Sequence, residues 1–282
     1  MIQHLLSPRE DALLPILQSE FNLDIEFCQF LLGLGAIYHN HTRAKENLNV
    51  KIGDYIRAHT NPRRFPVDRD WKKLIHFDHS EFVIINKPFG VPTHPSVDNI
   101  IENSTHQMSL ALGQPIYVTH RLDVATSGLL CLAKTKGFQR KFNFCLRDKL
   151  IEKKYRAEAE GHLNQTGLIR HFMEQTTFLP KKLSIEPIEG WQECLLEIEK
   201  VNHKFLTNGS PYSEIDIRLI TGRTHQIRSQ LAALGHPILR DKIYGGKMCE
   251  SLGPWEKVEN IELIARYLKF DVGEVFEFNL DS

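Results

Sequence analysis

Two segments of the sequence alternate polar and apolar residues with a period of two, and this alternation constrains the fold more than any other feature. Residues 155–159 and 214–219 both carry it. Because successive side chains of a strand point to opposite faces, such segments are typical of strands with one buried and one solvated face. Short apolar runs at residues 82–85 and 129–133 indicate further, more fully buried strands. We therefore expect an antiparallel or mixed β-sheet.

Two other segments repeat their apolar residues at the spacing of a helix. The first, residues 137–150, has one apolar face formed by Phe138, Phe142, Cys145 and Leu146. The second, residues 224–234, has an inward face formed by Ile227, Leu231 and Leu234. We expect Thr224 to cap this helix and Gly235 to end it. Sheet and helices together predict the α+β class.

The segment at residues 61–66 contains two prolines, which break regular structure, and it predicts a domain boundary or linker. We expect a small N-terminal region over residues 1–65 and a larger domain over residues 66–282. A chain of 282 residues with 41% hydrophobic and 25% charged residues has a globular composition and enough length for both.

Charge and cysteine content narrow the class of protein. Lys and Arg together number 35, as do Asp and Glu, so a polyanionic partner must be held by a local patch. No stretch reaches the roughly 18 apolar residues of a membrane span and no secretory leader is apparent, so we expect a soluble, unprocessed protein. The cysteines are odd in number and form no CxxC pair, which predicts a reducing, cytoplasmic location. They are Cys28, Cys131, Cys145, Cys194 and Cys249.

The densest group of reactive side chains is the polar loop at residues 119–128, directly before an apolar run. Loops held by a rigid sheet often carry chemistry, which makes Asp123 a candidate catalytic carboxylate. The alternative is a turn in which Asp123 and Thr126 bond their own backbone and Gly128 supplies an unusual dihedral angle. The residue types alone leave both interpretations open.

A second polar group, residues 221–228, lies where a strand gives way to a helix. Free amides and the positive end of the helix dipole favour an anion there, and Arg223 has the chemistry to bind a carboxylate or phosphate with two hydrogen bonds. The alternative is a capped helix with solvated arginines, which is the preferred interpretation for Arg228 taken alone.

Between these groups runs a basic tract whose only acids are Asp148 and Glu152. Its cations are Lys134, Lys136, Arg140, Lys141, Arg147, Lys149, Lys153, Lys154 and Arg156. Aromatic residues lie among the charges, so the tract is either a phosphate-binding surface or a solvated helix face.

Several familiar motifs are absent. The sequence has no phosphate loop, and residues 33–35 lack the third glycine and the strand-helix context of a dinucleotide fingerprint. Ser127 does not form the GxSxG elbow of a hydrolase. Histidine pairs such as His76 with His79 have no obvious third ligand nearby. We therefore expect neither a cofactor nor a metal.

Residues 120–128 (HRLDVATSG) strongly resemble the HRLDxxTSG motif of the RluA-type pseudouridine synthases. Residues 86–94 (NKPFGVPTH) resemble the N-K-P-x-G-x-x-x-H loop of that family, and residues 153–157 (KKYRA) resemble its K-x-Y-x-A strand. Residues 221–228 (TGRTHQIR) and 234–238 (LGHPI) are similar to two further elements. These motifs occur in the order of the family and extend over most of the larger domain.

The resemblance implies the pseudouridine synthase fold, a central mixed, largely antiparallel β-sheet flanked by helices, with the active site in a cleft across the sheet. It also implies an isomerase that converts uridine to pseudouridine in tRNA or rRNA without a cofactor. Residues 32–59 resemble, in diverged form, a small RNA-binding module found in many relatives. One departure is Arg240, because the family usually has glycine before the residue that is Asp241 here.

The family assigns roles to residues of these motifs. Asp123 is the implied catalytic carboxylate, which either adds covalently to the nucleoside or removes a sugar proton as a glycal forms. Arg223 is the implied partner that keeps Asp123 ionised. Tyr155 is expected to stack on the uracil and to take, or help to move, the C5 proton, and Arg121 to fill the gap left by the extruded uridine. Further substrate contacts are expected from His94, His120, Thr126, Lys153, Ile227 and Arg228.

Two other classes of protein are alternatives. A noncatalytic RNA-binding protein or RNA chaperone would keep the fold, but it has no need of an ionised carboxylate facing a polyanion. A hydrolase or metal enzyme would have to use the histidines and Ser127 without a supporting motif. We expect a monomer whose partner is RNA, not a membrane.

Overall fold

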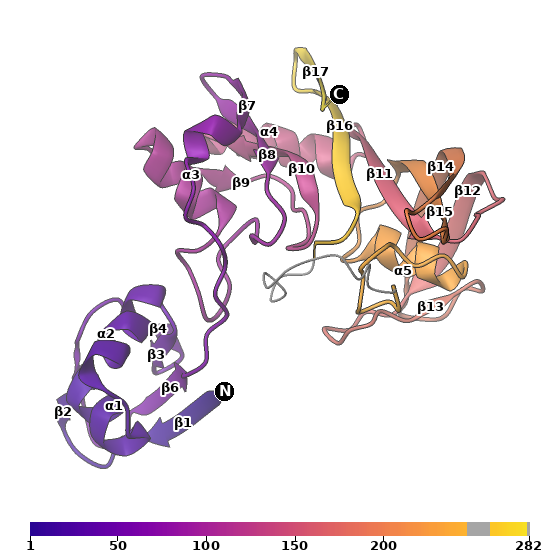
Figure 1. Cartoon of the computed structure of the whole chain (residues 1–282). Helices are drawn as coiled ribbons and strands as arrows, with labels where there is room; N and C mark the ends of the chain where they lie inside the picture. The colour runs from indigo at the N-terminus through magenta and orange to yellow at the C-terminus, as the bar shows by residue number, and fades with distance from the viewer. Residues whose placement is uncertain (247–259, 281–282) are drawn as a thin grey trace. The chain divides into compact units, whose positions relative to one another are not determined.

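The computed structural model describes residues 1–246 and 260–280, and the chain divides into two compact units (Figure 1). Unit 1 comprises residues 1–69 and 92–113, and unit 2 comprises residues 70–91 and 114–282. The chain first leaves unit 1 close to the proline-containing segment, and residues 92–113 then return to it. Cys249 lies outside the described residues.

Two ion pairs tie the returning segment to the proline-containing segment. The guanidinium of Arg63 binds Asp98 at 2.8 Å, and that of Arg64 binds Glu102 at 2.6 Å. Both carboxylates are largely buried and also accept backbone N–H groups, from Arg63 and Phe65. Because several charge-assisted hydrogen bonds hold it, this segment is a fixed part of unit 1 and not a free linker.

Unit 1 combines three helices with short strands. The helices are α1 (Leu13–Phe21), α2 (Ile25–Leu34) and α3 (Ser104–Leu112). The strands are β1 (Ile2–Leu6), β2 (Asp11–Ala12), β3 (Ile37–His39), β4 (Thr42–Arg43), β5 (Asn49–Val50) and β6 (Tyr55–His59). An antiparallel sheet has the order β1-β6-β3-β4, and β2 pairs with β5. One face of the sheet packs Ile37, Ile56 and Ala58 against apolar side chains of α1 and α2.

Unit 2 is organised around one large sheet of eleven described strands (Figure 1). They are β7 (Ile75–Asp78), β8 (Phe82–Lys87), β9 (Tyr117–Val118), β10 (Ser127–Ala133), β11 (Glu152–Glu160), β12 (Gly167–Met173), β13 (Leu183–Ser184), β14 (Gln192–Phe205), β15 (Pro211–Leu219), β16 (Leu263–Asp271) and β17 (Val275–Asn279). Their order is β13-β12-β14-β15-β11-β16-β10-β8-β7, with β17 beside β16 and β9 beside β10. The β10–β16 pair is parallel and the other described pairs are antiparallel. The predicted mixed, largely antiparallel sheet is confirmed.

The helices of unit 2 are the 3-10 helix η1 (Trp71–Leu74), α4 (Lys136–Arg147) and α5 (Gln226–Ala233). Helix α4 begins where Thr135 Oγ1 accepts the N–H of Phe138 at 3.1 Å. It buries Phe138, Phe142 and Cys145, as the sequence predicts, and Phe138 stacks on Phe82 of β8 at 4.6 Å between centroids. Within residues 1–246 and 260–280, no helix has both the length and the apolarity that crossing a bilayer requires.

The two alternating segments form neighbouring strands within the sheet. In β11, Tyr155 and Ala157 are buried and the residues beside them are partly exposed. In β15, Ile215 and Ile217 are fully buried. Strand β11 pairs with β15 on one side and with β16 on the other. The prediction of half-buried strands is therefore confirmed, and it places Tyr155 on the buried face.

The start of α5 differs from the sequence expectation. Its N-cap is His225, which has a left-handed φ of 58°, and not Thr224. The side chain of Gln226 reaches back over this turn, and its Oε1 accepts the N–H of Arg223 at 3.0 Å. The expected stop at Gly235 is confirmed, because this residue has a φ of 83° and closes the last turn with backbone hydrogen bonds.

Candidate active site

The polar loop between β9 and β10 is anchored at its first residues. Thr119 Oγ1 donates to the carbonyl of Cys131 at 2.6 Å, and the Cys131 N–H donates to His120 Nε2 at 3.1 Å. The His120 ring also stacks on Phe142, with 5.6 Å between centroids. Burial, with a smaller effect of Lys153, lowers the pKa of His120 to about 3, so the ring is neutral at physiological pH. The structure uses His120 as a buried anchor, whereas the sequence predicted a substrate contact.

Asp123 lies in a tight turn of this loop. The Thr126 N–H donates to the Asp123 carbonyl at 3.1 Å. Leu122, Ala125 and Thr126 are buried, while Arg121 is exposed. The loop thus forms a turn, which was the alternative interpretation of its residue types, and a backbone hydrogen bond closes it. It leaves the Asp123 side chain 25% exposed, so the carboxylate is accessible from solvent.

A buried lysine fixes the other side of the loop. Lys87, at the end of β8, is fully buried and its Nζ donates to the carbonyl of Val91 at 2.7 Å. The same ammonium lies 3.5 Å from the carbonyl of Val124, which also accepts the Gly90 N–H at 2.7 Å. Val124, the residue after Asp123, is thereby held by Lys87 and by the backbone of Gly90. Sequence reasoning did not select Lys87, although the NKPFG segment contains it.

Gly128 lies where the loop enters the sheet. Its φ of 111° is a conformation that residues with a side chain rarely adopt. A Cβ atom here would lie 2.2 Å from the carbonyl oxygen of Ala265 in the parallel neighbour β16. Glycine therefore permits the close pairing of β10 with β16 directly after the turn that carries Asp123.

The carboxylate of Asp123 faces the start of α5. Its Oδ2 lies 3.9 Å from Nη1 of Arg228 and 3.9 Å from Nε2 of His225. Arg223, the partner expected from the sequence, is exposed and makes no ion pair with Asp123 within residues 1–246 and 260–280. The structure corrects this expectation, because Arg223 precedes the left-handed turn at His225 and Arg228 lies on the buried face of the helix that follows.

Arg228 is held by a second carboxylate, that of Asp241. Nε and Nη2 of its guanidinium donate to the two Asp241 oxygens, each at 2.7 Å, and both residues are almost completely buried. Such a bidentate bond fixes the plane of the guanidinium and leaves Nη1 for Asp123. The interpretation of Arg228 as a solvated arginine is wrong, because the chain returns at residue 241 to pair with it.

Arg228 Nη1 also fixes the protonation of His225. It donates to His225 Nε2 at 2.9 Å, and because a guanidinium cannot accept a hydrogen bond, Nε2 carries no proton. The proton of the neutral ring is then on Nδ1, which donates to Tyr244 Oη at 3.3 Å. Burial lowers the pKa of His225, which favours this neutral form. Arg228 is therefore the cation beside Asp123.

Arg240 precedes Asp241 at the position where the family usually has glycine. Its φ of 67° lies in the left-handed region that favours glycine, which explains the preference. The Arg240 guanidinium binds Glu262 at 2.8 Å. The side chain thus finds a partner of its own, and the unusual residue leaves the bond between Asp241 and Arg228 in place.

Tyr155 lies on β11 close to Asp123. Its side chain is 6% exposed, and burial together with the negative charge of Asp123 raises the pKa of its hydroxyl. The hydroxyl therefore keeps its proton at neutral pH. Lys153, two residues earlier, is half-buried, and burial lowers the pKa of its ammonium. Asp123, Tyr155 and Arg228 come from three of the sequence motifs, and they thus lie together around the carboxylate of Asp123.

Two other predicted contacts have different environments. Ile227 is 4% exposed and belongs to the buried face of α5. His94 belongs to unit 1, where its Nδ1 lies 2.9 Å from the carbonyl of Pro95.

Neighbouring acids neutralise much of the basic tract. The ion pairs are Lys134 with Asp78, Lys141 with Glu81, Arg147 with Asp148, Lys154 with Glu199, and Arg156 with Asp216. Phe138 and Phe142 belong to the core, while Phe144 is 52% exposed. In the described part of the chain, the cations of the tract without such a pair are Lys136, Arg140, Lys149 and Lys153. The tract is therefore not a continuous basic surface.

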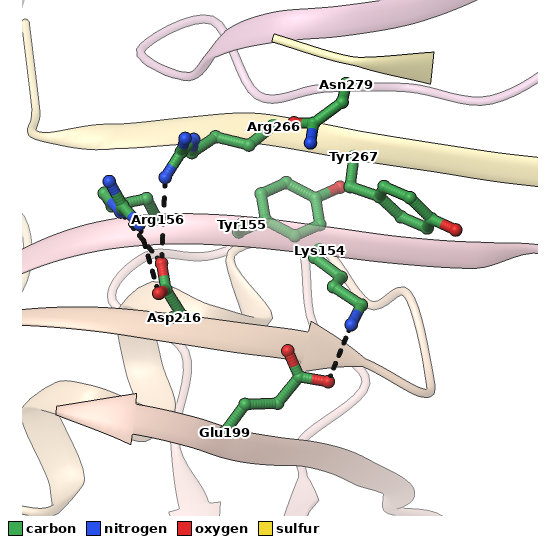
Figure 2. A pocket seen from close by; sticks show the side chains of 8 residues that line it. All are labelled: Lys154, Tyr155, Arg156, Glu199, Asp216, Arg266, Tyr267 and Asn279. Atoms are coloured by element: carbon green, nitrogen blue, oxygen red, sulfur yellow. Dashed lines mark hydrogen bonds and ion pairs between the residues drawn. The ribbon is translucent and has the colours of Figure 1, made fainter. Parts of the chain in front are cut away.

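A hollow of about 430 Å³ opens on the face of the sheet from which Lys154 and Arg156 project (Figure 2). Its lining residues are Lys154, Tyr155, Arg156, Glu199, Asp216, Arg266, Tyr267 and Asn279. Arg156 and Arg266 lie 2.8 and 3.9 Å from Asp216, and Lys154 binds Glu199 at 3.0 Å. Both carboxylates of this hollow are therefore bound by cations at 2.8 to 3.0 Å, in contrast to the accessible carboxylate of Asp123.

Comparison with known proteins agrees with the motifs. Residues 81–233 match the family model described as RNA pseudouridylate synthase. The chain belongs to this family. The matched segment includes Asp123, Tyr155 and Arg228, while Asp241 lies beyond its end.

Two relatives and one solved structure show the extent of the similarity. RNA pseudouridine synthase 6, chloroplastic, of Oryza sativa subsp. japonica is 35% identical over 218 residues, which cover 70% of this chain and 46% of that protein. The mitochondrial tRNA pseudouridine(32) synthase of Saccharomyces cerevisiae is 28% identical over 237 residues, which cover 84% of this chain and 51% of that protein. The chain thus spans about half the length of these relatives. The structure of Human RNA Pseudouridylate Synthase Domain Containing 1 matches with a TM-score of 0.60 and 26% identity, covering 74% of this chain and 82% of that one.

Proposed function

We propose that this RNA pseudouridylate synthase family member isomerises uridine to pseudouridine within structured RNA, with Asp123 as the catalytic carboxylate. The observation that carries the proposal is the environment of Asp123. Its carboxylate is accessible, lies 3.9 Å from the buried cation Arg228 and interacts with Tyr155. A protein that only binds RNA gains nothing from an accessible carboxylate in its site, because the carboxylate repels phosphates.

The reaction breaks the bond between C1′ and N1 of the uracil, turns the detached ring, joins C1′ to C5 and removes the C5 proton. No atom is imported and nothing is oxidised. Asp123 acts on the sugar in its ionised form, either by adding covalently or by removing a proton as a glycal forms. Arg228, anchored by Asp241, places a positive charge beside this carboxylate. At 3.9 Å the two groups attract without a direct hydrogen bond, so the oxygens of Asp123 stay available to the substrate.

Tyr155 and Arg121 supply the other steps. We propose that the Tyr155 ring supports the uracil and that its hydroxyl relays the C5 proton, because the raised pKa makes a free phenolate base unfavourable. Extruding a uridine from a stack costs a few kcal/mol. Arg121, exposed on the same loop as Asp123, is the proposed side chain that fills the vacated space.

The proposed targets are tRNA and rRNA, and the name of the yeast relative refers to tRNA. Pseudouridine mapping across total RNA tests this proposal in cells that lack the protein and in cells that express it again. Specific sites should disappear on deletion, return with the wild-type chain and stay absent with Asp123→Asn. Identical maps in all three strains would contradict the proposed activity, and the position of the lost sites would separate tRNA from rRNA.

We further propose that the protein is a monomer in the cytoplasm. Cys28, Cys131, Cys145 and Cys194 are free and buried, which suits a compartment that keeps thiols reduced. Cell fractionation and sedimentation of the purified chain test both points. Recovery in an organelle would contradict the location, and a concentration-independent dimer would contradict the monomer.

A further inference from the structure

Tyr244 lies behind the two side chains that face Asp123, and the proposed reaction gives it no role. The guanidinium of Arg228 lies 5.4 Å from the centroid of its ring. The ring also meets His225 edge to face, with 5.8 Å between centroids. Tyr244 therefore contacts both His225 and Arg228, each of which lies 3.9 Å from the carboxylate of Asp123.

The hydroxyl of Tyr244 accepts two hydrogen bonds. The backbone N–H of Lys181 donates to its oxygen at 3.1 Å. The second donor is His225 Nδ1 at 3.3 Å, because Arg228 donates to Nε2 of the same ring and leaves the proton of the neutral imidazole on Nδ1. Neither of these bonds uses the hydrogen of the hydroxyl.

This hydrogen has no acceptor among the residues that the structure describes, where the hydroxyl forms the two bonds above. Both oxygens of the nearby Asp241 are already bound by Arg228 at 2.7 Å. Burial, with smaller effects of the negative charges of Asp241 and Asp123, raises the pKa of Tyr244, so the hydroxyl keeps its hydrogen at neutral pH. The side chain is only partly buried, so a molecule that enters from solvent can accept the hydrogen bond.

The position of the hydroxyl relates it to the substrate. His225 lies between the two groups, since its Nε2 is 3.9 Å from Asp123 Oδ2 and its Nδ1 is 3.3 Å from Tyr244 Oη. One imidazole ring thus separates the hydroxyl from the carboxylate that acts on the sugar in the proposed reaction. The uracil is bonded to C1′ of that sugar, and its two carbonyl oxygens are hydrogen-bond acceptors.

We infer that the Tyr244 hydroxyl donates a hydrogen bond to a carbonyl oxygen of the target uracil, an inference that rests on the proposed function. When the bond between C1′ and N1 breaks, the electron pair stays with the uracil and spreads over N1 and the two carbonyl oxygens. A fixed donor at one of these oxygens stabilises the charge as it develops. The hydrogen stays on Tyr244 throughout, so no proton is gained or lost in this contact. A phosphate of the RNA fits less well, because the carboxylates of Asp123 and Asp241 repel it.

Single-turnover rates on a short RNA that carries the mapped target test the inference. The target is supplied as uridine, 2-thiouridine or 4-thiouridine, because sulfur in place of a carbonyl oxygen is a weak acceptor. Tyr244→Phe should slow the reaction of the uridine RNA by about ten-fold or more. It should slow the reaction of one of the two thio RNAs by less than about three-fold, because the wild-type chain has already lost the same bond there.

The control is Tyr267→Phe, which removes the hydroxyl of a partly exposed tyrosine that lines the hollow on the opposite face of the sheet (Figure 2). Its rates on the three RNAs should stay within about two-fold of wild type, because the two sites are independent. Equal slowing of Tyr244→Phe on all three RNAs would mean that the hydroxyl acts only through Lys181 and His225, and it would overturn the inference. A wild-type rate of Tyr244→Phe on the uridine RNA would overturn it as well.

A second measurement depends neither on the fold of Tyr244→Phe nor on turnover. The full chain is irradiated with a short oligouridine in which 4-thiouridine replaces uridine. The base should crosslink to the peptide that contains Tyr244, because the inference places the uracil within hydrogen-bond distance of this side chain. Crosslinks that never include this peptide would overturn the inference.

The two measurements separate this inference from the enzymatic proposal. If the crosslink to Tyr244 forms while the wild-type chain makes no pseudouridine in any RNA, the contact stands and the proposed activity fails. If the wild-type chain modifies RNA while Tyr244→Phe slows the three RNAs equally, the activity stands and the contact fails.

Discussion

The two faces of the sheet around β11 hold their carboxylates in different ways. On one face, Arg156 binds Asp216 directly at 2.8 Å. On the other, Asp123 lies 3.9 Å from Arg228, which makes its short bonds to Asp241 at 2.7 Å. A carboxylate in a direct pair is occupied, whereas one that is attracted but not bound can still act on a substrate. Because Asp241 takes the short bonds of Arg228, the carboxylate of Asp123 stays available.

Replacing Arg228 with methionine should have the largest combined effect on stability and on the rate of pseudouridine formation. It leaves Asp241 as a buried charge without its partner, so the free energy of unfolding should fall by about 3–5 kcal/mol. It also removes the cation beside Asp123, so pseudouridine formation should fall by about 10²-fold or more under conditions where the variant is folded. Chemical denaturation and a single-turnover assay measure the two effects.

The matched control is Arg223→Met, which changes the exposed arginine of the same segment. Its free energy of unfolding should stay within about 1 kcal/mol of wild type, because surface pairs contribute little, and its rate should fall much less than that of Arg228→Met. Equal losses of stability and rate in the two variants would contradict the assignment of Arg228 as the partner of Asp123.

Replacing Tyr155 with phenylalanine should separate binding from proton transfer. The ring stays, so RNA affinity should remain within about two-fold, but loss of the hydroxyl should slow the isomerisation by about ten- to a hundred-fold. Filter binding and single-turnover rates on the same RNA provide the comparison. A wild-type rate would exclude a role for the hydroxyl.

The buried ring of His120, which anchors the loop, should make the free energy of unfolding depend on pH. The pKa of His120 is about 3 in the folded protein, below the ordinary value, so the unfolded chain binds its proton first as the pH falls. The stabilising effect of the neutral ring is therefore complete above about pH 6.5 and is lost progressively below it. Between pH 7 and 5 the wild-type chain should lose about 2 kcal/mol more stability than His120→Gln. Equal losses in urea titrations of the two proteins would contradict the buried neutral ring.

Breaking the ion pair between Arg156 and Asp216, on the opposite face of the sheet, should have the smallest effect on stability and rate. Asp216→Asn removes the charge bound by Arg156, and both side chains are partly exposed. The free energy of unfolding should therefore change by about 1 kcal/mol or less, and the isomerisation rate should stay within about two-fold. A loss of rate similar to that of Arg228→Met would contradict the distinction between the paired carboxylate of Asp216 and the available carboxylate of Asp123.

The sequence was informative wherever a local pattern decides the structure. Alternation with a period of two placed Tyr155 on the buried face of β11, and the polar residues before β10 formed the turn that carries Asp123. The family motif implied the catalytic role of Asp123, but the choice of Arg223 as its cationic partner was wrong, because Arg228 lies beside the carboxylate. The position of Arg228 depends on the left-handed turn at His225, which positions the helix behind it.

Partners far apart in the sequence were not predictable in this way. Lys87 bonds to the carbonyl of Val124, 37 residues later, and Arg228 pairs with Asp241 only because the chain turns back. The return of residues 92–113 to unit 1 likewise depends on carboxylates that bind Arg63 and Arg64. Each contact is decided by tertiary packing, for which neither spacing nor composition gives a signal.

One measurement tests the role of Asp123 most directly. RNA labelled with tritium at C5 of uracil releases one tritium to water for each pseudouridine formed, because C5 gives up its hydrogen when it binds C1′. With protein in excess, the wild-type chain and Asp216→Asn should release tritium at similar rates. Asp123→Asn should bind the same RNA within a few-fold and release none. Release by Asp123→Asn at a rate near that of the wild-type chain would contradict the catalytic role of this carboxylate.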